Sequence, residues 1–220
     1  MKKYKASLIS LAVIGLMAAS ASQAAVIPAS IFPFDSTNTT DTFQVRVKSW
    51  HDPAFGDMGW THHSDWGTVA VKRGQVVTIK LATSVAGLHP GITVWYRGLS
   101  DTAPDNYVVD HFYAQNSPMF KLGAIDDSTG ADIGNIVMKY VAHRYDRDTD
   151  PLLGPIQKAL PLMNGNLDTL PGQLTLKFTA QQTGTYMFVV GGVNPDPVIA
   201  TSTLKHPVNV TVTVTGIGKI

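Results

Sequence analysis

The octapeptide WTHHSDWG, residues 60–67, holds two tryptophans and two histidines in a 220-residue chain that has only 4 Trp and 7 His. If the stretch is extended, its side chains alternate between two faces. Trp60, His62 and Trp66 then share one face, while the second histidine shares the other with an aspartate. Because imidazole binds copper, zinc, nickel and iron, the first face predicts either part of a metal site or an aromatic-rich packing strand.

A metal site needs a second histidine from elsewhere in the chain, and His111 is a candidate. It lies in NYVVDHFYAQ, where Val109, His111 and Tyr113 fall on one face of a predicted strand. Two histidines from neighbouring strands can converge on one ion. The chain has no Cys, which excludes the thiolate-containing sites of blue copper proteins and of many zinc proteins. The remaining candidates are His51, His89, His143 and His206.

A second group of candidate ligands lies in HRYDRDTDP, residues 143–151. Its aspartates alternate along the chain as Asp146, Asp148 and Asp150, like the start of a calcium-binding loop. An EF-hand requires Gly at the sixth position and Glu at the twelfth, but the sixth residue here is a proline and the chain has no Glu. The cluster therefore predicts either a calcium site of another kind or surface ion pairs with the two interleaved arginines, worth roughly 0–1 kcal/mol each.

The composition indicates a β protein. All 16 acidic residues are Asp, and the chain has 19 Gly and 13 Pro. Asp favours turns, whereas Glu favours helix interiors. The absence of Glu also excludes enzyme classes that depend on it, such as the HExxH metalloproteases.

Residues 1–24 have the pattern of a secretory signal peptide. Three lysines open the segment, an apolar stretch covers residues 8–19, and Ser22 and Ala24 are small residues suited to cleavage. The apolar stretch is too short to span a membrane. We expect a single mature domain over residues 25–220, without a transmembrane segment, whose net charge changes from +1 to −2 when the lysines are removed. No basic patch remains to bind nucleic acid.

Strand patterns recur through the rest of the chain, separated by Gly and Pro, and their spacing predicts a secreted β-sandwich with long loop insertions and little helix. We expect residues 118–170 to form a long insertion, with an ambiguous apolar stretch at 133–142 and a short helix at 155–162, and His89 to lie in a turn. His206 is expected at the surface. The predicted strands are 42–50, 68–71, 76–82, 91–96, 107–114, 174–179, 186–190 and 208–215.

A Trp-x-His motif followed about 50 residues later by a strand histidine, in a Cys-free β-rich chain, resembles the methanotroph surface copper-binding proteins. These are the copper-repressible CorA, unrelated to the magnesium transporter of that name, and the C-terminal region of MopE. The resemblance covers the whole mature chain. It implies a mononuclear Cu(I) site of two histidines and a tryptophan oxidised to kynurenine, and the matching positions are Trp60, His62 and His111.

The implied chemistry agrees with the residues. Indole has a donor N–H and no lone pair for a metal, whereas opening of its five-membered ring exposes an aniline-type nitrogen. Two imidazoles and a neutral amine suit soft Cu(I) better than hard ions. Trp66, on the same face as Trp60, remains a rival for the modification.

The resemblance implies copper acquisition or handling at the outer cell surface, with an outer-membrane partner and no catalysis; a periplasmic location is also compatible with the signal peptide. The competing hypothesis is an extracellular adhesion-type sandwich stabilised by calcium and without copper. A copper oxidase is a third hypothesis, for which the sequence offers neither open coordination sites nor a substrate pocket.

Overall fold

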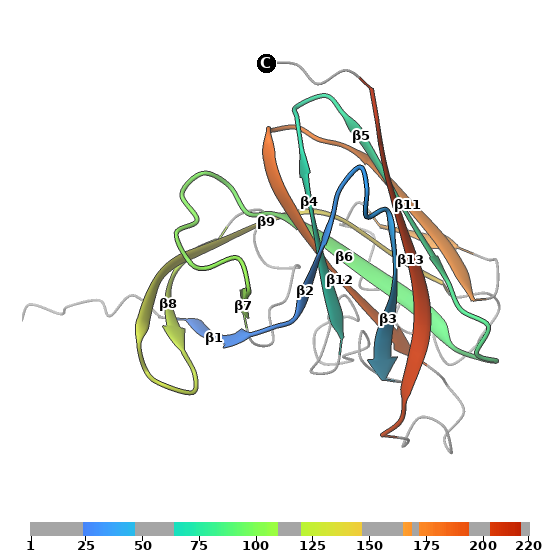
Figure 1. Ribbon diagram of the computed structural model, residues 1–220, viewed down its shortest axis with the longest axis horizontal. Coiled ribbons are helices and arrows are strands. Elements are labelled where there is room, and N and C mark those ends of the chain that lie inside the picture. Colours follow the sequence, from blue (N-terminus) through green and yellow to red (C-terminus); the bar gives the residue numbers. More distant parts are fainter. Residues whose placement is uncertain are drawn as a thin grey trace, which may run out of the picture.

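The fold of the chain, given by a computed structural model, is built of strands (Figure 1). The structure describes residues 24–46, 64–109, 120–146, 165–168, 172–193 and 203–216. Every regular element within these ranges is a strand, which confirms the expected class. The strands are β1 (Ala24–Pro28), β2 (Ile31–Phe34), β3 (Thr40–Arg46), β4 (Asp65–Val71), β5 (Val76–Ala82), β6 (His89–Tyr96), β7 (Tyr107–Val109), β8 (Phe120–Asp126), β9 (Asp132–Asp146), β10 (Gly165–Asp168), β11 (Gln173–Thr179), β12 (Gly184–Val193) and β13 (Lys205–Thr215).

The strands form two sheets. The larger sheet has the order β2-β4-β12-β6-β9-β8-β1-β7, with β10 beside β9, and the smaller one has the order β11-β5-β13-β3. Together they confirm the predicted β-sandwich. The described residues include no helix with the length and apolarity that crossing a membrane requires.

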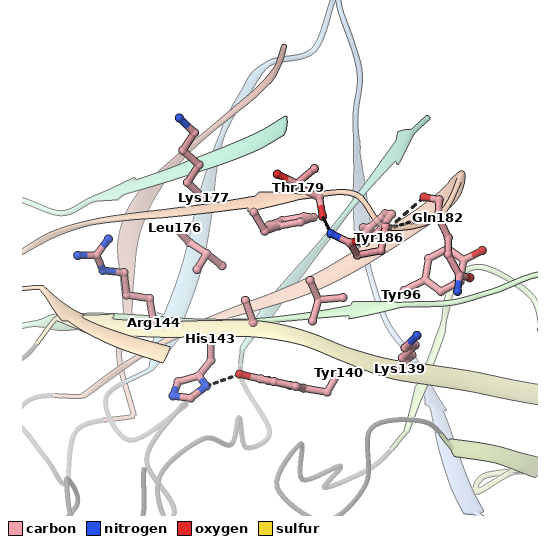
Figure 2. Close-up of a pocket in the computed structure, with 14 residues that line it drawn as sticks. Tyr96, Lys139, Tyr140, His143, Arg144, Leu176, Lys177, Thr179, Gln182 and Tyr186 are labelled. Atoms are coloured by element: carbon pink, nitrogen blue, oxygen red, sulfur yellow. Dashed lines mark hydrogen bonds between the residues drawn. The ribbon is translucent and has the colours of Figure 1, made fainter. Parts of the chain in front are cut away.

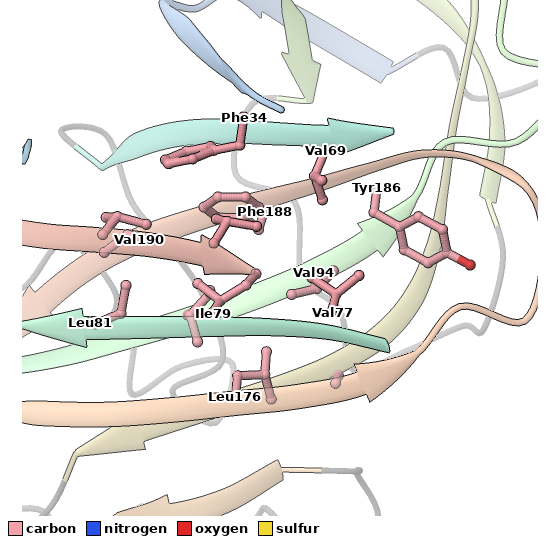
Figure 3. Packing of buried hydrophobic residues seen from close by; sticks show 14 of the residues in the cluster. Phe34, Val69, Val77, Ile79, Leu81, Val94, Leu176, Tyr186, Phe188 and Val190 are labelled. Atoms are coloured by element: carbon pink, nitrogen blue, oxygen red, sulfur yellow. The ribbon is translucent and has the colours of Figure 1, made fainter. Parts of the chain in front are cut away.

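The main core lies between the sheets and follows from alternation in the smaller sheet. On β5, Val77, Ile79 and Leu81 are buried. They meet Val94 of β6 and Phe188 of β12 across the sandwich (Figure 3). Burying one such side chain stabilises the fold by about 1.5–3 kcal/mol. This buried layer therefore contributes much of the stability of the sandwich.

A second apolar cluster covers the other face of the larger sheet. Trp66 and Trp95 stack at its centre, with ring centroids 5.9 Å apart and an interplanar angle of 28°. The sheet extends around this cluster through β9, whose first half pairs with β8 and whose second half pairs with β6. The cluster therefore joins distant strands of the larger sheet, through Val26, Trp66, Trp95, Ala103, Val108, Ala124, Ile136, Met138, Met187 and Val189.

Two predictions about the middle of the chain are wrong. Residues 120–146 are not a loop insertion but a hairpin, in which a turn at 127–131 connects β8 to β9 near the middle of the larger sheet. His89 is not in a turn but is the first residue of β6, which is buried throughout. Strands buried on both faces lack the polar–apolar alternation by which a half-buried strand is recognised. The helix expected at 155–162 lies outside the described residues.

Candidate metal centre

The predicted copper ligands Trp60, His62 and His111 lie outside the described residues, but the strands that adjoin them are described. β4 begins at Asp65, three residues after His62, and β7 ends at Val109, two residues before His111. The structure thus describes the strands that adjoin the candidate ligands.

A single segment of chain connects these two strands. In β1, Pro28 pairs with Tyr107 of β7, and in β2, Ile31 pairs with Trp66 of β4. Pro28 and Ile31 are three residues apart, so their Cα atoms are at most about 11 Å apart. Both Trp66 and Val108 also belong to the second apolar cluster. β4 and β7 are therefore linked through β1 and β2 and contribute to one apolar cluster, although they stand far apart in the order of the sheet.

The described end of the WTHHSDWG motif alternates as expected. The Asp65 carboxylate accepts a hydrogen bond from the backbone N–H of Gln44, at 2.6 Å, and so ties β4 to the smaller sheet. Trp66 points to the other face, where it is 5 % exposed. Gly67 again faces the sandwich, where an added Cβ would lie 2.5 Å from Cζ of Phe188. The prediction of alternation is confirmed for these three residues.

Trp66 has a packing role. Its indole stacks on Trp95, and Met187 and Val189 of β12 belong to the same cluster. Large aromatic rings in such clusters contribute mainly buried apolar area and specific ring contacts. This environment supports Trp66 as the structural tryptophan of the motif and leaves Trp60 as the candidate for oxidation.

His143 is a buried histidine on β9, facing away from the main core. It pairs in register with Thr93, and its Nδ1 lies 2.8 Å from the hydroxyl of Tyr140. Burial lowers the pKa of the imidazole to about 4, because a charged ring would lose its hydration. The side chain is therefore neutral at pH 7. His143 was one of the remaining candidate ligands, and no pattern in the sequence predicted that it is buried.

Of the three acidic candidates, the structure describes only Asp146. Asp146 is fully buried, accepts a hydrogen bond of 2.6 Å from the backbone N–H of Gly172, and lies 3.4 Å from Nδ1 of His89. It ties the end of β9 to the start of β11, and the surface ion pair expected for it is wrong. Asp148 and Asp150 lie outside the described residues, so a calcium site there stays a prediction. His206, expected at the surface, is half-buried in β13.

Within the described ranges, no three His, Asp, Glu or Cys side chains converge as a metal site would require. His89 and Asp146 form a pair of such side chains, with 3.4 Å between Nδ1 and Oδ2. Any site built from the motif histidines therefore depends on the segments between the described ranges.

Comparisons with known proteins agree on one family. A sequence model described as "Copper(I)-binding protein CorA-like" matches residues 22–200. The structure of CorA, a surface-associated copper-binding protein important in copper acquisition of Methylomicrobium album BG8, superimposes with a TM-score of 0.72. That protein is 37 % identical, and the match covers 86 % of this chain and 100 % of that one.

A second solved structure shares the fold. It is MopE, a secreted protein of Methylococcus capsulatus in which an oxidised tryptophan facilitates copper binding. The TM-score is 0.59 and the identity 19 %, with 87 % of this chain and 94 % of that chain covered. No curated protein sequence matches this chain.

Proposed function

Because the chain belongs to the family of copper(I)-binding CorA-like proteins, we propose that it binds copper at the outer cell surface or as a secreted protein. Its role is the acquisition or handling of copper. The observation that carries this proposal is the similarity, at 37 % identity over 86 % of the chain, to a surface-associated protein of copper acquisition. Residues 1–24 act as the signal peptide that exports it.

The proposed ligands are His62, His111 and Trp60, the last as its oxidation product kynurenine. Alternation through residues 65–67 supports a common face for the two ligands in the motif. The linkage of β4 and β7 through β1 and β2 supports the approach of the third. MopE provides a precedent for an oxidised tryptophan in copper binding.

The metal is proposed to be held as Cu(I). Two neutral imidazoles and one amine nitrogen suit a soft ion that accepts few ligands. The function is binding and not catalysis, with an outer-membrane component as the partner that keeps the protein at the surface. No described residue favours the calcium alternative.

The test is to purify the protein from its natural host and measure its metal content and intact mass. We expect copper at a ratio near one per chain and a mass raised by the conversion of one tryptophan to kynurenine. A peptide map would place the added mass in the peptide that contains Trp60. Calcium without copper, at the unmodified mass, would contradict the proposal and favour the adhesion-type alternative.

A further inference from the structure

A groove opens along one edge of the sandwich, where β9 of the larger sheet faces β11 of the smaller one (Figure 2). Its volume is about 570 Å³, inside the range of roughly 300–1,000 Å³ that is common for small-molecule sites. Tyr140 and His143 project from β9 on the side away from β11. The groove is therefore separate from the face of the sheet that carries the second apolar cluster.

A β-bulge shapes the floor of the groove. Ala142 pairs with Val94, but Tyr140 already pairs with Trp95, so Val141 is an extra residue in β9. Tyr140 packs on the second cluster, whereas Val141 and Ala142 both pack on the main core. The bulge thus turns two successive apolar side chains toward the groove, and bulges commonly re-aim side chains in this way at functional sites.

Aromatic rings form one wall. Tyr186 lies between Phe178 and Tyr96, at centroid distances of 5.3 Å and 5.1 Å. The hydroxyl of Tyr186 donates to the carbonyl of Gln182, at 3.1 Å, and that of Tyr96 donates to the carbonyl of Thr183, at 3.1 Å. Because both hydroxyls are engaged by the backbone, the wall is rigid and offers apolar surface to a ligand.

The charged groups at the groove all have one sign. Lys139 and Arg144 line its two ends, whereas the Lys177 side chain at its rim points away from β9 (Figure 2), and no acidic residue of the described chain lines the groove. Arg144 donates a hydrogen bond to the carbonyl of Thr175, which fixes its position beside β11. Neither lysine ammonium forms an ion pair or hydrogen bond within the part of the chain that the structure describes. Although the chain has 16 acidic residues, the charged residues that line the groove in the described part of the chain are all cationic.

We propose that this groove binds a small anionic molecule with a flat apolar body. The rings and the bulge residues would cover the apolar body, and Lys139, which is paired in register with Tyr96 at one end of the groove, would pair with its acidic group. A neutral analogue lacks the charge interaction, and a hydrophilic anion lacks the apolar one, so both bind less tightly. The site is distinct from the proposed copper ligands and does not rest on copper binding.

The test uses two fluorescent probes with the same aromatic framework. One is 8-anilinonaphthalene-1-sulfonate, an anion, and the other is N-phenyl-1-naphthylamine, its neutral counterpart. We expect the anion to bind the folded full chain saturably, with one site per chain, and to raise its Tm. The neutral probe should bind at least about tenfold more weakly, and only the anion should lose affinity in high salt.

Variants separate the two contributions. Lys139→Gln should weaken binding of the anion about three- to tenfold and leave the neutral probe unchanged, whereas Lys177→Gln, which alters a side chain that points away from the groove, should leave both probes unchanged. Phe178→Ala should weaken both probes, and Phe178→Leu serves the same purpose if the alanine variant does not fold. The matched control is Lys80→Gln, which removes an exposed lysine of β5 outside the groove. Equal effects of Lys80→Gln and Lys139→Gln, unsaturable binding, or equal affinity for both probes would each overturn the proposal.

Discussion

Ile31 of β2 pairs in parallel with Trp66 of β4, three residues after Pro28 of β1 pairs with Tyr107 of β7. The short segment between these pairs links β4, which contains the end of the WTHHSDWG motif, to β7, the strand that precedes His111. The strands that adjoin the two parts of the proposed copper site are thus linked by backbone pairing. From this we expect the ligand variants below to fold.

The first prediction concerns the histidines. His62→Ala or His111→Ala should abolish stoichiometric copper binding, because one remaining imidazole is an inadequate chelate. Titration of purified protein with Cu(I) under a competing chelator measures the loss, and circular dichroism checks the fold. His63→Ala is the matched control, since alternation puts this neighbour on the opposite face. Full copper retention in His111→Ala would exclude that residue as a ligand.

The second prediction distinguishes the two tryptophans of the motif. Trp60→Phe should lower copper affinity by orders of magnitude with little loss of stability, because a phenyl ring cannot expose a nitrogen. Trp66→Phe should keep most of the copper affinity but lower the free energy of unfolding by about 1–3 kcal/mol, through the void left beside Trp95. Chelator competition and denaturant unfolding measure the two effects. The reverse pattern would move the modified residue to Trp66.

These predictions rest on a motif that the sequence could identify, while other parts of the molecule could not be foreseen. The strand over 76–82 was predicted with its observed bounds, because β5 buries one face and alternates. β9 lies in the expected insertion, and its apolar stretch at 133–142 was ambiguous because Ile136, Val137 and Met138 are buried in succession, which hides the strand period. The groove lies between β9 and β11, which belong to different sheets. No local sequence pattern indicates that these two strands face each other.

The third prediction concerns Gly67, the last residue of the motif. Gly67→Ala should lower the free energy of unfolding by about 1–3 kcal/mol, because its Cβ would lie 2.5 Å from Cζ of Phe188 and 2.9 Å from Cε2 of Phe34. Phe188→Leu should recover part of this loss in the double variant, since it removes the clashing atom. A double-mutant cycle measured by urea unfolding checks the coupling. Additive losses would show that the clash is relieved elsewhere.

The fourth prediction concerns copper binding and pH. Protons compete with copper for the imidazoles of His62 and His111, so copper affinity should fall as the pH drops through about 6.5, the ordinary His pKa. The measurement is copper occupancy at limiting metal between pH 8 and pH 5. Occupancy that does not change over this range would indicate a site without histidine.

The last prediction concerns the stability of the copper-free protein and tests the burial of His143. Burial lowers the pKa of this imidazole from 6.5 to about 4, so between these values the unfolded chain binds a proton that the folded chain does not. The free energy of unfolding is therefore unaffected by this imidazole above about pH 6.5. It falls as the pH drops toward 4, by an amount on the order of 3 kcal/mol. His143→Gln, which keeps a polar side chain near Tyr140, should remove this part of the pH dependence. Urea unfolding of both proteins at pH 7.5, 5.5 and 4.5 measures the difference. If the two proteins lose stability in parallel as the pH falls, His143 is not the group responsible.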